Sequence, residues 1–303
     1  MDVSVIIVSY NTKDLTLQCV NSVLEQTKEV SFEVIIVDND SKDGTKEYFI
    51  NDSRITYIQN DSNVGFGIAN NIGVNVSKGR YVFLLNSDTI LLNNAIKLFY
   101  DFMVENETKN TVGVIGTVLL NMDKTEGLSV IHFKSISYLL RLSFRKLIQK
   151  IFGLSQAFVD KKLPNKMTFN VDGVMGADMF IPSTVYKKIN GFDDSYFMFG
   201  EEVDLQKRIK DLGLQRLIIR GPQIIHIHGG SGDNDGRKLS FRSIYSIQKG
   251  SIFFIKKNYS SLYYISYKFI LLLIWFPWVL IDKRFDAIQR ISLFKLIINP
   301  SKY

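Results

Sequence analysis

Short apolar runs alternate with longer amphipathic stretches along the first 120 residues of the chain. The amphipathic stretches repeat apolar side chains at helical spacing: Leu17, Val20 and Leu24 recur within residues 12–26, and a similar pattern occupies residues 93–106. The apolar runs are nearly continuous, which is typical of parallel strands buried on both faces. We therefore predict strands at residues 3–10, 32–39, 55–60, 80–88 and 111–120.

This alternation of strands and helices predicts an α/β fold with a mixed, mainly parallel sheet flanked by helices. We expect that domain to occupy residues 1–236. Within it, residues 121–170 carry nine basic and three acidic side chains, so we expect an insertion or a mobile loop that contains a basic amphipathic helix near residues 141–153. The helical pattern returns at residues 200–213.

Residues 237–303 form a different region, which is basic, aromatic and helical in pattern. It carries twelve Lys or Arg and two Asp residues, so its local charge is +10 within a chain of net charge +7. Its longest apolar run, residues 269–281, is shorter than the ~20 residues of a spanning helix. Tyr, Trp and Lys residues around that run favour a segment lying in the headgroup region of an anionic membrane. A spanning helix and a buried core helix are the alternatives, and the aliphatic bulk argues against nucleic acid.

Composition narrows the class of protein further. The 303 residues are 46% hydrophobic, which is ample for a globular core. A single cysteine, Cys19, excludes an internal disulfide and fits a reducing compartment. The N-terminus lacks the basic region and cleavage site of a signal peptide, so we expect a cytoplasmic protein.

Polar side chains follow each predicted strand, where open α/β sheets bind their ligands. Gly44 is the first glycine in the chain, so the glycine-rich first turn of a dinucleotide-binding domain is absent, and no P-loop motif occurs. A metal ion would then be needed to neutralise bound phosphates. The candidate binding residues at these strand ends are Ser9, Tyr10, Asn11, Asp38, Asp40, Asn63, Gly65, Phe66, Gly67, Asn71, Asn86 and Asp88.

Two of these carboxylates have a local alternative. Asp88 follows a buried strand and suits a divalent cation that bridges a diphosphate, but residues 86–88 equally suit a turn that caps the next helix. Asp38 is either a ligand-binding residue or a turn former. The loop at residues 63–71 is more distinctive, because its glycines permit close backbone approach and its amides offer paired donors and acceptors.

The stretch FMFGEEVDL, residues 197–205, sets three carboxylates directly after an aromatic run. Acidic residues in a first helical turn complement the helix dipole, which accounts for Glu201 and Asp204. The aromatic approach additionally indicates a carboxylate at a pocket wall, where partial desolvation raises the pKa toward that of a general base. His226 and His228 would share one face of a strand and are candidates for a metal ligand, a pH sensor or a buried structural role.

Seven segments in order resemble glycosyltransferase family 2, in particular its rhamnosyltransferase-like members. They are VSVIIVSYN, VIIVDNDSKDGT, NVGFGIANNIG, FLLNSDTIL, GVMGADMFI, GFDDSYFMFGEEVDLQKR and IIHIHGGS, which together run from about residue 3 to residue 231. The resemblance implies a GT-A fold, a nucleotide-diphosphate sugar donor, a divalent cation (Mg²⁺ or Mn²⁺) and inversion at the anomeric carbon.

By this resemblance, Asp38 contacts the nucleotide base or ribose, with Tyr10 and Asn11 lining the same pocket. Asp88 is the metal-binding member of a degenerate D-x-D motif, Asn86-Ser87-Asp88, and His226 is a further metal ligand. His226 is chosen over His228 because it lies five residues before Ser231. Gly176, Ala177 and Asp178 border the donor sugar and the acceptor.

Glu202 occupies the position of the catalytic base in the same resemblance. The family motif usually reads Glu-Asp where this chain has Glu201-Glu202, so Glu201 stays an alternative base. The implied function is a metal-dependent, inverting glycosyltransferase that acts at the cytoplasmic membrane face on a lipid-linked or oligosaccharide acceptor in cell-surface polysaccharide synthesis. The resemblance to the rhamnosyltransferase-like members implies rhamnose as the sugar. A sugar nucleotidyltransferase and a non-catalytic, membrane-bound glycan or nucleotide binder are the competing hypotheses.

Overall fold

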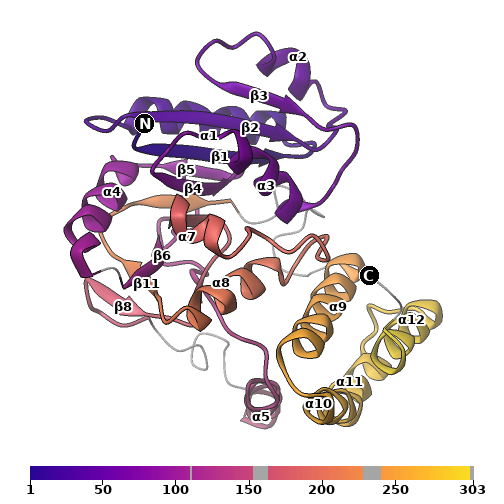
Figure 1. Ribbon diagram of the computed structural model, residues 1–303. Coiled ribbons are helices and arrows are strands. Elements are labelled where there is room, and N and C mark those ends of the chain that lie inside the picture. Colours follow the sequence, from indigo (N-terminus) through magenta and orange to yellow (C-terminus); the bar gives the residue numbers. More distant parts are fainter. Residues whose placement is uncertain (110, 153–162, 228–239, 301–303) are drawn as a thin grey trace. The chain divides into compact units, whose positions relative to one another are not determined.

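The computed structural model describes residues 1–109, 111–152, 163–227 and 240–300 (Figure 1). The chain divides into two compact units. Met1–Ile131 and Lys166–Lys238 form the first, and His132–Asn165 and Leu239–Tyr303 form the second. The contacts of residues 132–152 therefore group them with the C-terminal helices.

The first unit is built on a mixed sheet, in which the described strands follow the order β3-β2-β1-β4-β10-β6-β11-β8. Strands β1 to β4 pair with one another in parallel, whereas β10 runs antiparallel to β4. The start of β10 therefore lies beside the end of β4, with Asp178 opposite Leu85. The bounds are β1 Val3–Ser9, β2 Phe32–Asp38, β3 Thr56–Gln59, β4 Tyr81–Asn86, β6 Val112–Thr117, β8 Thr168–Asn170, β10 Asp178–Pro182 and β11 Gln215–Ile219.

Two short strand pairs extend this framework around the sheet edge. Strand β5 (Thr89–Leu91) pairs antiparallel with β12 (Ile224–His226), and His226 lies opposite Thr89. Strand β7 (Val130–Ile131) pairs antiparallel with β9 (Gly173–Val174). The first pair carries His226 to the end of β4, although 140 positions separate this residue from Asn86.

Helices cover both faces of the sheet, and they bury the apolar faces that the sequence pattern indicates (Figure 1). Cys19, Val20 and Val23 of α1 join Phe99 and the strand residues in one buried core. The predicted α/β architecture is confirmed. The helices of this unit are α1 Lys13–Gln26, α2 Thr45–Phe49, α3 Phe66–Val76, α4 Ala95–Glu105, the 3₁₀ helix η1 Glu107–Lys109, α7 Ser183–Lys188 and α8 Glu201–Asp211.

One prediction of local structure is wrong: most of residues 63–71 is helix and not loop, because α3 begins at Phe66. Just beyond this stretch, Gly73 permits close packing of the helix on the sheet. A Cβ atom at Gly73 would lie 2.5 Å from Ile6 Cγ2 and 3.1 Å from Val37 Cγ2. A larger residue there would push α3 off strands β1 and β2.

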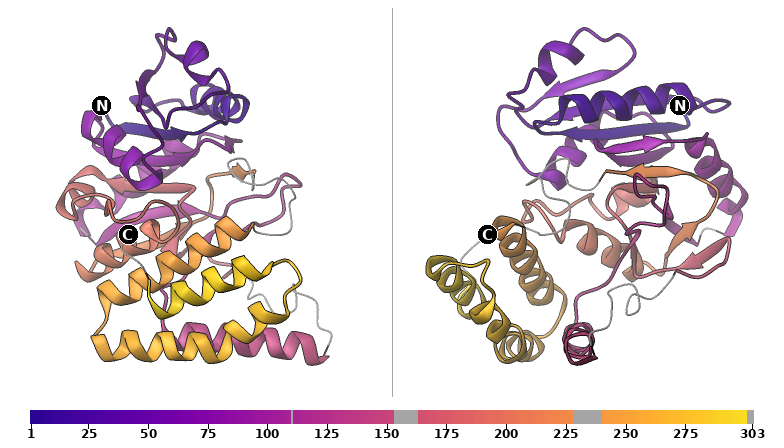
Figure 2. Two further views of the ribbon diagram at one scale, coloured as in Figure 1. Left: turned by 90° about the vertical axis from the view of Figure 1, so that its right-hand side faces the viewer. Right: turned by 180° about the vertical axis from the view of Figure 1, so that it is seen from behind.

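The second unit is helical within the described residues (Figure 2). Its core includes Val279, Phe285 and Leu293. Ser240, Ser260 and Asp286 cap three of its helices through side-chain hydrogen bonds. The helices are α5 Ile136–Phe152, α9 Phe241–Asn258, α10 Ser261–Ile274, α11 Phe276–Ile281 and α12 Ala287–Ile298. Among the described residues, the stretch Ser261–Ile281 alone is long and apolar enough to cross a membrane, judged by length and composition.

Candidate active site

Asp88 and His226 face each other at the end of β4. The backbone N–H of Ile227 donates to the carbonyl oxygen of Asp88 at 2.8 Å, which extends the β5–β12 pairing. His226 Nε2 lies 3.2 Å from Asp88 Oδ1 and 3.4 Å from Asn86 Nδ2. Both Asp88 and His226 are only 7% exposed. The strand end thus brings a carboxylate and an imidazole together at a position that is largely shielded from solvent.

The donor atoms of this cluster fit a hard divalent cation whose remaining coordination positions are filled by a substrate. Within the described part of the chain, the buried Asn86 Oδ1 accepts no hydrogen bond. Together with Asp88 and His226 it offers two oxygens and one nitrogen. No group of three or more His, Cys, Asp or Glu residues that could hold a metal occurs among the described residues. A cation here would therefore need phosphate oxygens as further ligands, as Mg²⁺ commonly has in nucleotide sites.

The turn before α8 places Glu201 and Glu202 at the start of that helix. Phe199 and Gly200 both adopt left-handed backbone conformations, with φ of 68° and 104°. The backbone N–H of Gly200 donates to Glu202 Oε2 at 3.1 Å. Phe197 just before the turn is 56% exposed, so its ring does not join the core. The aromatic stretch thus lies at the surface and leads directly into the carboxylates.

The two neighbouring glutamates differ sharply in environment. Glu201 is 4% exposed, and in the described part of the molecule nothing donates a hydrogen bond to its Oε2. Burial, and secondarily the adjacent Glu202 carboxylate, raise the pKa of Glu201 to about 8. Glu202 is only partly buried. Glu201 therefore keeps its proton near neutral pH, and Glu202 is the member of the pair that reaches solvent.

The rest of α8 anchors this turn. Gln206 donates to the carbonyl oxygen of Val174 at 2.8 Å and accepts from its N–H at 2.7 Å. Arg208 binds Asp204 at 2.8 Å and the carbonyl oxygen of Gly191 at 2.7 Å. Asp204 is fully buried in this ion pair. Among the three acidic residues of the turn, Asp204 thus has a structural role.

Residues 176 and 177 join the Asp88 strand end to the Glu202 turn. The backbone N–H of Asn86 donates to the carbonyl oxygen of Ala177 at 3.0 Å. A Cβ atom added to Gly176 would lie 3.6 Å from Glu202 Cβ. Asp88, Gly176 and Glu202 therefore belong to one continuous neighbourhood, although their elements are far apart in sequence.

Asp178 lies inside the sheet and holds two strands together. Its side chain is fully buried, and Oδ2 accepts a hydrogen bond from the N–H of Thr117 at 2.6 Å. Burial raises the pKa of Asp178 well above its usual range. Because β6 and β10 share only the Phe180–Ile115 register pair, this side chain supplies a link that the strand ladder lacks.

Asp38 and Asn11 fix the turn that follows β2. Asp38 Oδ1 accepts from the N–H of Ser41 at 2.9 Å, and Oδ2 accepts from the hydroxyl of Tyr57 at 2.6 Å. The side chain of Asn11 accepts from the N–H of Lys42 at 2.7 Å. Asp38 is fully buried, so its carboxylate shapes this loop from within.

Ser9, the last residue of β1, and the residues after it differ in their exposure to solvent. Ser9 is fully buried, and its hydroxyl lies 3.0 Å from the hydroxyl of Thr16. Tyr10 is 41% exposed. Of residues 9–11, Tyr10 and Asn11 are therefore exposed and open to a ligand.

A polar hollow of about 460 Å³ opens at the carboxyl ends of β2 and β3. Among the predicted binding residues only Asp40 lines it, where it pairs with Lys42 at 2.5 Å. The sequence analysis missed the other polar residues. The signal available for them was two lysines, at positions 42 and 46, in a loop that directly follows a buried strand. The hollow is lined by Asp40, Ser41, Lys42, Gly44, Lys46, Glu47, Gln59, Asn60 and Asp61.

The start of α3 contacts the turn that leads to the glutamates. Phe66 N–H donates to the carbonyl oxygen of Phe197 at 3.2 Å, and Gly67 lies against Glu201, whose Cβ would be 3.7 Å from a Cβ at position 67. Asn63 accepts from the N–H of Gly65 at 3.0 Å and so shapes the approach to the helix.

The amide of Asn71 serves a different segment, residues 186–194. Its Nδ2 donates to the carbonyl oxygen of Phe192 at 2.9 Å, and its Oδ1 accepts from the hydroxyl of Tyr186 at 2.7 Å. The Phe192 N–H also donates to this Oδ1, at 2.9 Å. Asn71 therefore attaches α3 to the segment that precedes the glutamate turn. The alternative metal ligand His228 and the marker residue Ser231 lie outside the described residues.

Comparisons with known proteins agree on the family. The sequence model of glycosyl transferase family 2 matches residues 4–162. The chain is 32% identical over 129 residues to glycosyltransferase GlyG of Streptococcus pneumoniae serotype 4, a match that covers 41% of each protein. It is 39% identical over 103 residues to the Escherichia coli UDP-Glc:alpha-D-GlcNAc-diphosphoundecaprenol beta-1,3-glucosyltransferase WfaP, covering 33% of this chain and 41% of that protein.

A third relative is the poly(ribitol-phosphate) beta-glucosyltransferase of Bacillus spizizenii, 29% identical over 119 residues, or 37% of this chain and 19% of the relative. The matches thus span less than half the length of each of these three relatives. The fold resembles that of S. aureus TarS with a TM-score of 0.54 and 15% identity, covering 93% of this chain and 44% of TarS. Because the family model matches more than half of the residues, the chain belongs to glycosyl transferase family 2.

Proposed function

We propose that the chain transfers a sugar from a nucleoside diphosphate donor to an acceptor hydroxyl, with inversion and with Glu202 as the general base. One observation carries this proposal: the partly open carboxylate of Glu202 adjoins Gly176, and the neighbouring Ala177 is bonded to Asn86 at the end of β4, where Asp88 faces His226. A base and an anchor for a leaving diphosphate thus lie in one neighbourhood, which is the arrangement that a single displacement needs.

In the proposed reaction, Glu202 accepts the proton of the acceptor hydroxyl. The acceptor oxygen then forms a bond to the anomeric carbon, while the bond from that carbon to the diphosphate oxygen breaks on the opposite face. The products are the glycosylated acceptor with inverted configuration, the free nucleoside diphosphate and a proton on Glu202. Asp88, His226 and the amide oxygen of Asn86 are the residues that would hold Mg²⁺ or Mn²⁺, which lowers the charge of the leaving diphosphate when bound.

Glu201 supports this division of roles. Its pKa of about 8 leaves it mostly protonated at pH 7, so a second negative charge beside Glu202 is avoided. A buried carboxyl that keeps its own proton is a poor acceptor for another. We therefore assign the base to Glu202 and a positioning role to Glu201.

The nucleotide end of the donor is proposed to bind at the carboxyl ends of β1 and β2. The open side chain of Tyr10 and the turn fixed by Asp38 support this assignment. The adjoining hollow of about 460 Å³ has a polar lining that includes Lys46, whereas its other lysine, Lys42, is paired with Asp40.

The acceptor and the cellular location of this chain are proposed from the names of its relatives. The name of one relative specifies poly(ribitol-phosphate), and that of another specifies a diphosphoundecaprenol-linked sugar. We propose a lipid-linked or oligosaccharide acceptor in cell-surface polysaccharide synthesis, reached at the cytoplasmic face of the membrane. Both of these names specify glucose, whereas the sequence resemblance indicates rhamnose, so a donor panel must contain both sugars.

The test combines donor binding with turnover. Thermal shift with a panel of nucleotide-sugars, with and without Mg²⁺ or Mn²⁺, identifies a donor, because a ligand of the folded state raises the melting temperature. Glu202→Gln should then lower kcat by about 10²–10⁴-fold and leave the donor Kd nearly unchanged. Glu105→Gln, at an exposed position of α4, is the matched control. Turnover of Glu202→Gln close to that of the unaltered protein would remove Glu202 from the base role.

A further inference from the structure

Two helices of the second unit expose a row of large apolar side chains, here called the apolar stripe. Its members on α10 are 59% to 76% exposed, and those on α12 are 50% to 77% exposed. Exposed apolar groups in such number on neighbouring elements indicate a surface that is covered in use. The stripe consists of Leu262, Ile265, Phe269 and Leu273 on α10 and of Ile288, Ile291 and Ile298 on α12.

The stripe occupies one side of each helix, and the core of the unit occupies the other. On α10 the stripe residues follow one another at intervals of three or four positions, so they share a face. Tyr267 and Leu271, which lie on the opposite face, are 4% and 1% exposed. Leu293 and Ile297 are fully buried on α12 in the same way. Each helix is therefore apolar on two sides, only one of which the unit itself covers.

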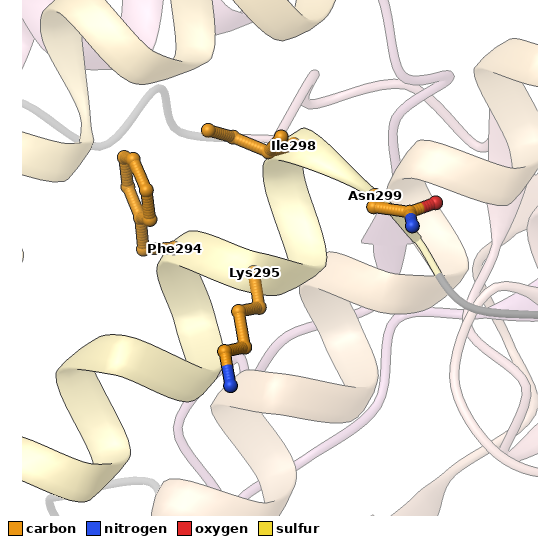
Figure 3. A pocket seen from close by; sticks show the side chains of 4 residues that line it. All are labelled: Phe294, Lys295, Ile298 and Asn299. Carbon is orange, nitrogen blue, oxygen red and sulfur yellow. The ribbon is translucent and has the colours of Figure 1, made fainter.

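The hollow at the end of α12 continues this surface. It has a volume of about 450 Å³ and is lined by Phe294, Lys295, Ile298 and Asn299. Figure 3 shows the side chains of Phe294 and Ile298 on the same side of the helix, whereas Lys295 points away from them. Apolar bulk on one side with a cation beside it is the pattern of a helix that lies in a lipid headgroup layer.

The charge of the unit selects the kind of surface. Residues 132–152 and 240–300 contain fourteen Lys or Arg and two Asp. Both acidic side chains are already engaged, since Asp282 binds Arg284 at 2.7 Å and Asp286 caps α12. The remaining positive charge is attracted to an anionic lipid surface and much less to a zwitterionic one.

We propose that the second unit docks in the plane of an anionic bilayer, with the apolar stripe inserted among the lipids, and that Ser261–Ile281 does not cross the bilayer. A spanning helix would face lipid on all sides, but the inner face of α10–α11 is occupied by Tyr267, Leu271 and Val279. Lys268 Nζ also donates to the carbonyl oxygen of Ile298 at 2.8 Å, which ties α10 to the end of α12. If this segment crossed the bilayer, the contact would break and the buried side chains of its inner face would lose their partners in the unit.

This inference deepens the membrane-face location in the proposed function by naming the surface and its orientation, and its readouts need no turnover. The first test is co-sedimentation of the full chain with vesicles of phosphatidylcholine, with and without phosphatidylglycerol. Binding should require the anionic lipid and weaken with salt. Ile265→Glu with Phe269→Glu should lower the vesicle affinity by about ten-fold or more, because both charges would enter the apolar layer.

Two further variants make that test specific. Ile288→Glu with Ile291→Glu probes α12 independently, so loss of binding in both pairs cannot be blamed on one misfolded helix. Met122→Glu, at a residue 63% exposed in the first unit, is the control and should bind as the unaltered protein does. Circular dichroism and melting temperature confirm folding. Undiminished binding of both stripe variants would overturn the proposal, even if sugar transfer were intact.

The orientation has its own test. The native Cys19 is fully buried and burial raises its pKa to about 12, so it is silent toward thiol reagents. Ser261→Cys and Lys283→Cys place exposed thiols at the two ends of α10–α11. In intact bacterial cells an impermeant maleimide should label neither, and after lysis it should label both. Labelling of either position in intact cells would show a crossing segment and overturn in-plane docking.

Discussion

Phe66 at the start of α3 and Phe197 before α8 are joined by a backbone hydrogen bond of 3.2 Å. Helix α3 follows the carboxyl end of β3, and α8 begins with the paired glutamates. The bond therefore couples the region proposed for the donor to the turn that carries the proposed base. Gly65 makes the approach possible, since a Cβ atom there would lie 2.3 Å from the carbonyl oxygen of Phe197.

Gly65→Ala should destabilise the protein by about 1–3 kcal/mol and lower turnover, because the new methyl group collides with backbone at Phe197. Gly213→Ala is a closely matched control. Gly213 has a similar positive φ of 78°, against 90° at Gly65, but a Cβ atom there meets nothing within 4 Å. The control carries the cost of a positive φ without the collision. Equal losses of melting temperature and kcat in the two variants would contradict the importance of the Phe66–Phe197 approach.

Glu201 predicts a pH-dependent stability. Its folded pKa of about 8 exceeds its usual 4.5, so between these pH values the folded state binds more protons than the unfolded state. The free energy of unfolding should therefore fall as pH rises from 4.5 to 8, and the full penalty should remain above pH 8. Glu201→Gln removes this group. Its stability relative to the unaltered protein should rise across that range, by a few kcal/mol at most.

Urea unfolding of Glu201→Gln at pH 5 and pH 8.5 measures this effect. Glu105→Gln, which changes an exposed carboxylate of α4, controls for general charge effects. A stability difference between Glu201→Gln and the unaltered protein that is the same at both pH values would contradict the raised pKa. The expected kcat loss of Glu201→Gln is smaller than that of Glu202→Gln, because its neutral amide mimics the protonated acid.

We expect the metal dependence of activity to rest mainly on the side chain of Asp88. Asp88→Asn should raise the Mn²⁺ concentration for half-maximal activity, or for half-maximal thermal shift with donor, by about ten-fold or more, since the only carboxylate of the cluster loses its charge. Asp101→Asn breaks the ion pair with Lys97 on α4 and serves as the control. An unchanged Mn²⁺ requirement in Asp88→Asn would place the cation elsewhere.

Asn71 predicts a loss of stability without a matching loss of donor affinity. Asn71→Ala removes the hydrogen bonds to Tyr186 and Phe192 and should lower the free energy of unfolding by about 2–3 kcal/mol. Tyr186→Phe removes only one of them and should cost about 1 kcal/mol. Denaturant unfolding measures both changes, and calorimetry measures the donor Kd. A large rise in donor Kd with little change in stability would give Asn71 the direct binding role that the sequence resemblance implies.

Strands β1 and β2 were predictable because most of their residues are buried on both faces of the sheet. Residues 3–10 and 32–39 are almost continuously apolar, and the structure has β1 and β2 at Val3–Ser9 and Phe32–Asp38. The helix α3 was not predictable from glycine content. Its Gly67 is required by close contact with Phe192 and its Gly73 by close contact with Ile6 and Val37, and not by local chain preference. Such tertiary contacts override propensity, which is a weak prior.

The candidate site divides along the same line. The polar residues at the strand ends, such as Asp88, could be found from sequence because a buried strand ends there. Which of them face inward could not, since this depends on partners far away in the chain. Asp178 bonds to Thr117 and Asn71 bonds to Phe192, and neither pairing leaves a sequence pattern. The exposed face of α12 was missed for the same reason. Both sides of this helix are apolar in sequence, and only the tertiary packing determines which side is buried.

The apolar stripe also has a practical consequence for handling the isolated protein. A surface of seven large aliphatic and aromatic side chains has no favourable partner in plain aqueous buffer. Molecules should then adhere to one another through it, so the apparent mass in size-exclusion chromatography would climb with concentration, and mild detergent would restore the monomer. Glutamate at positions 265 and 269 should have the same solubilising effect without detergent.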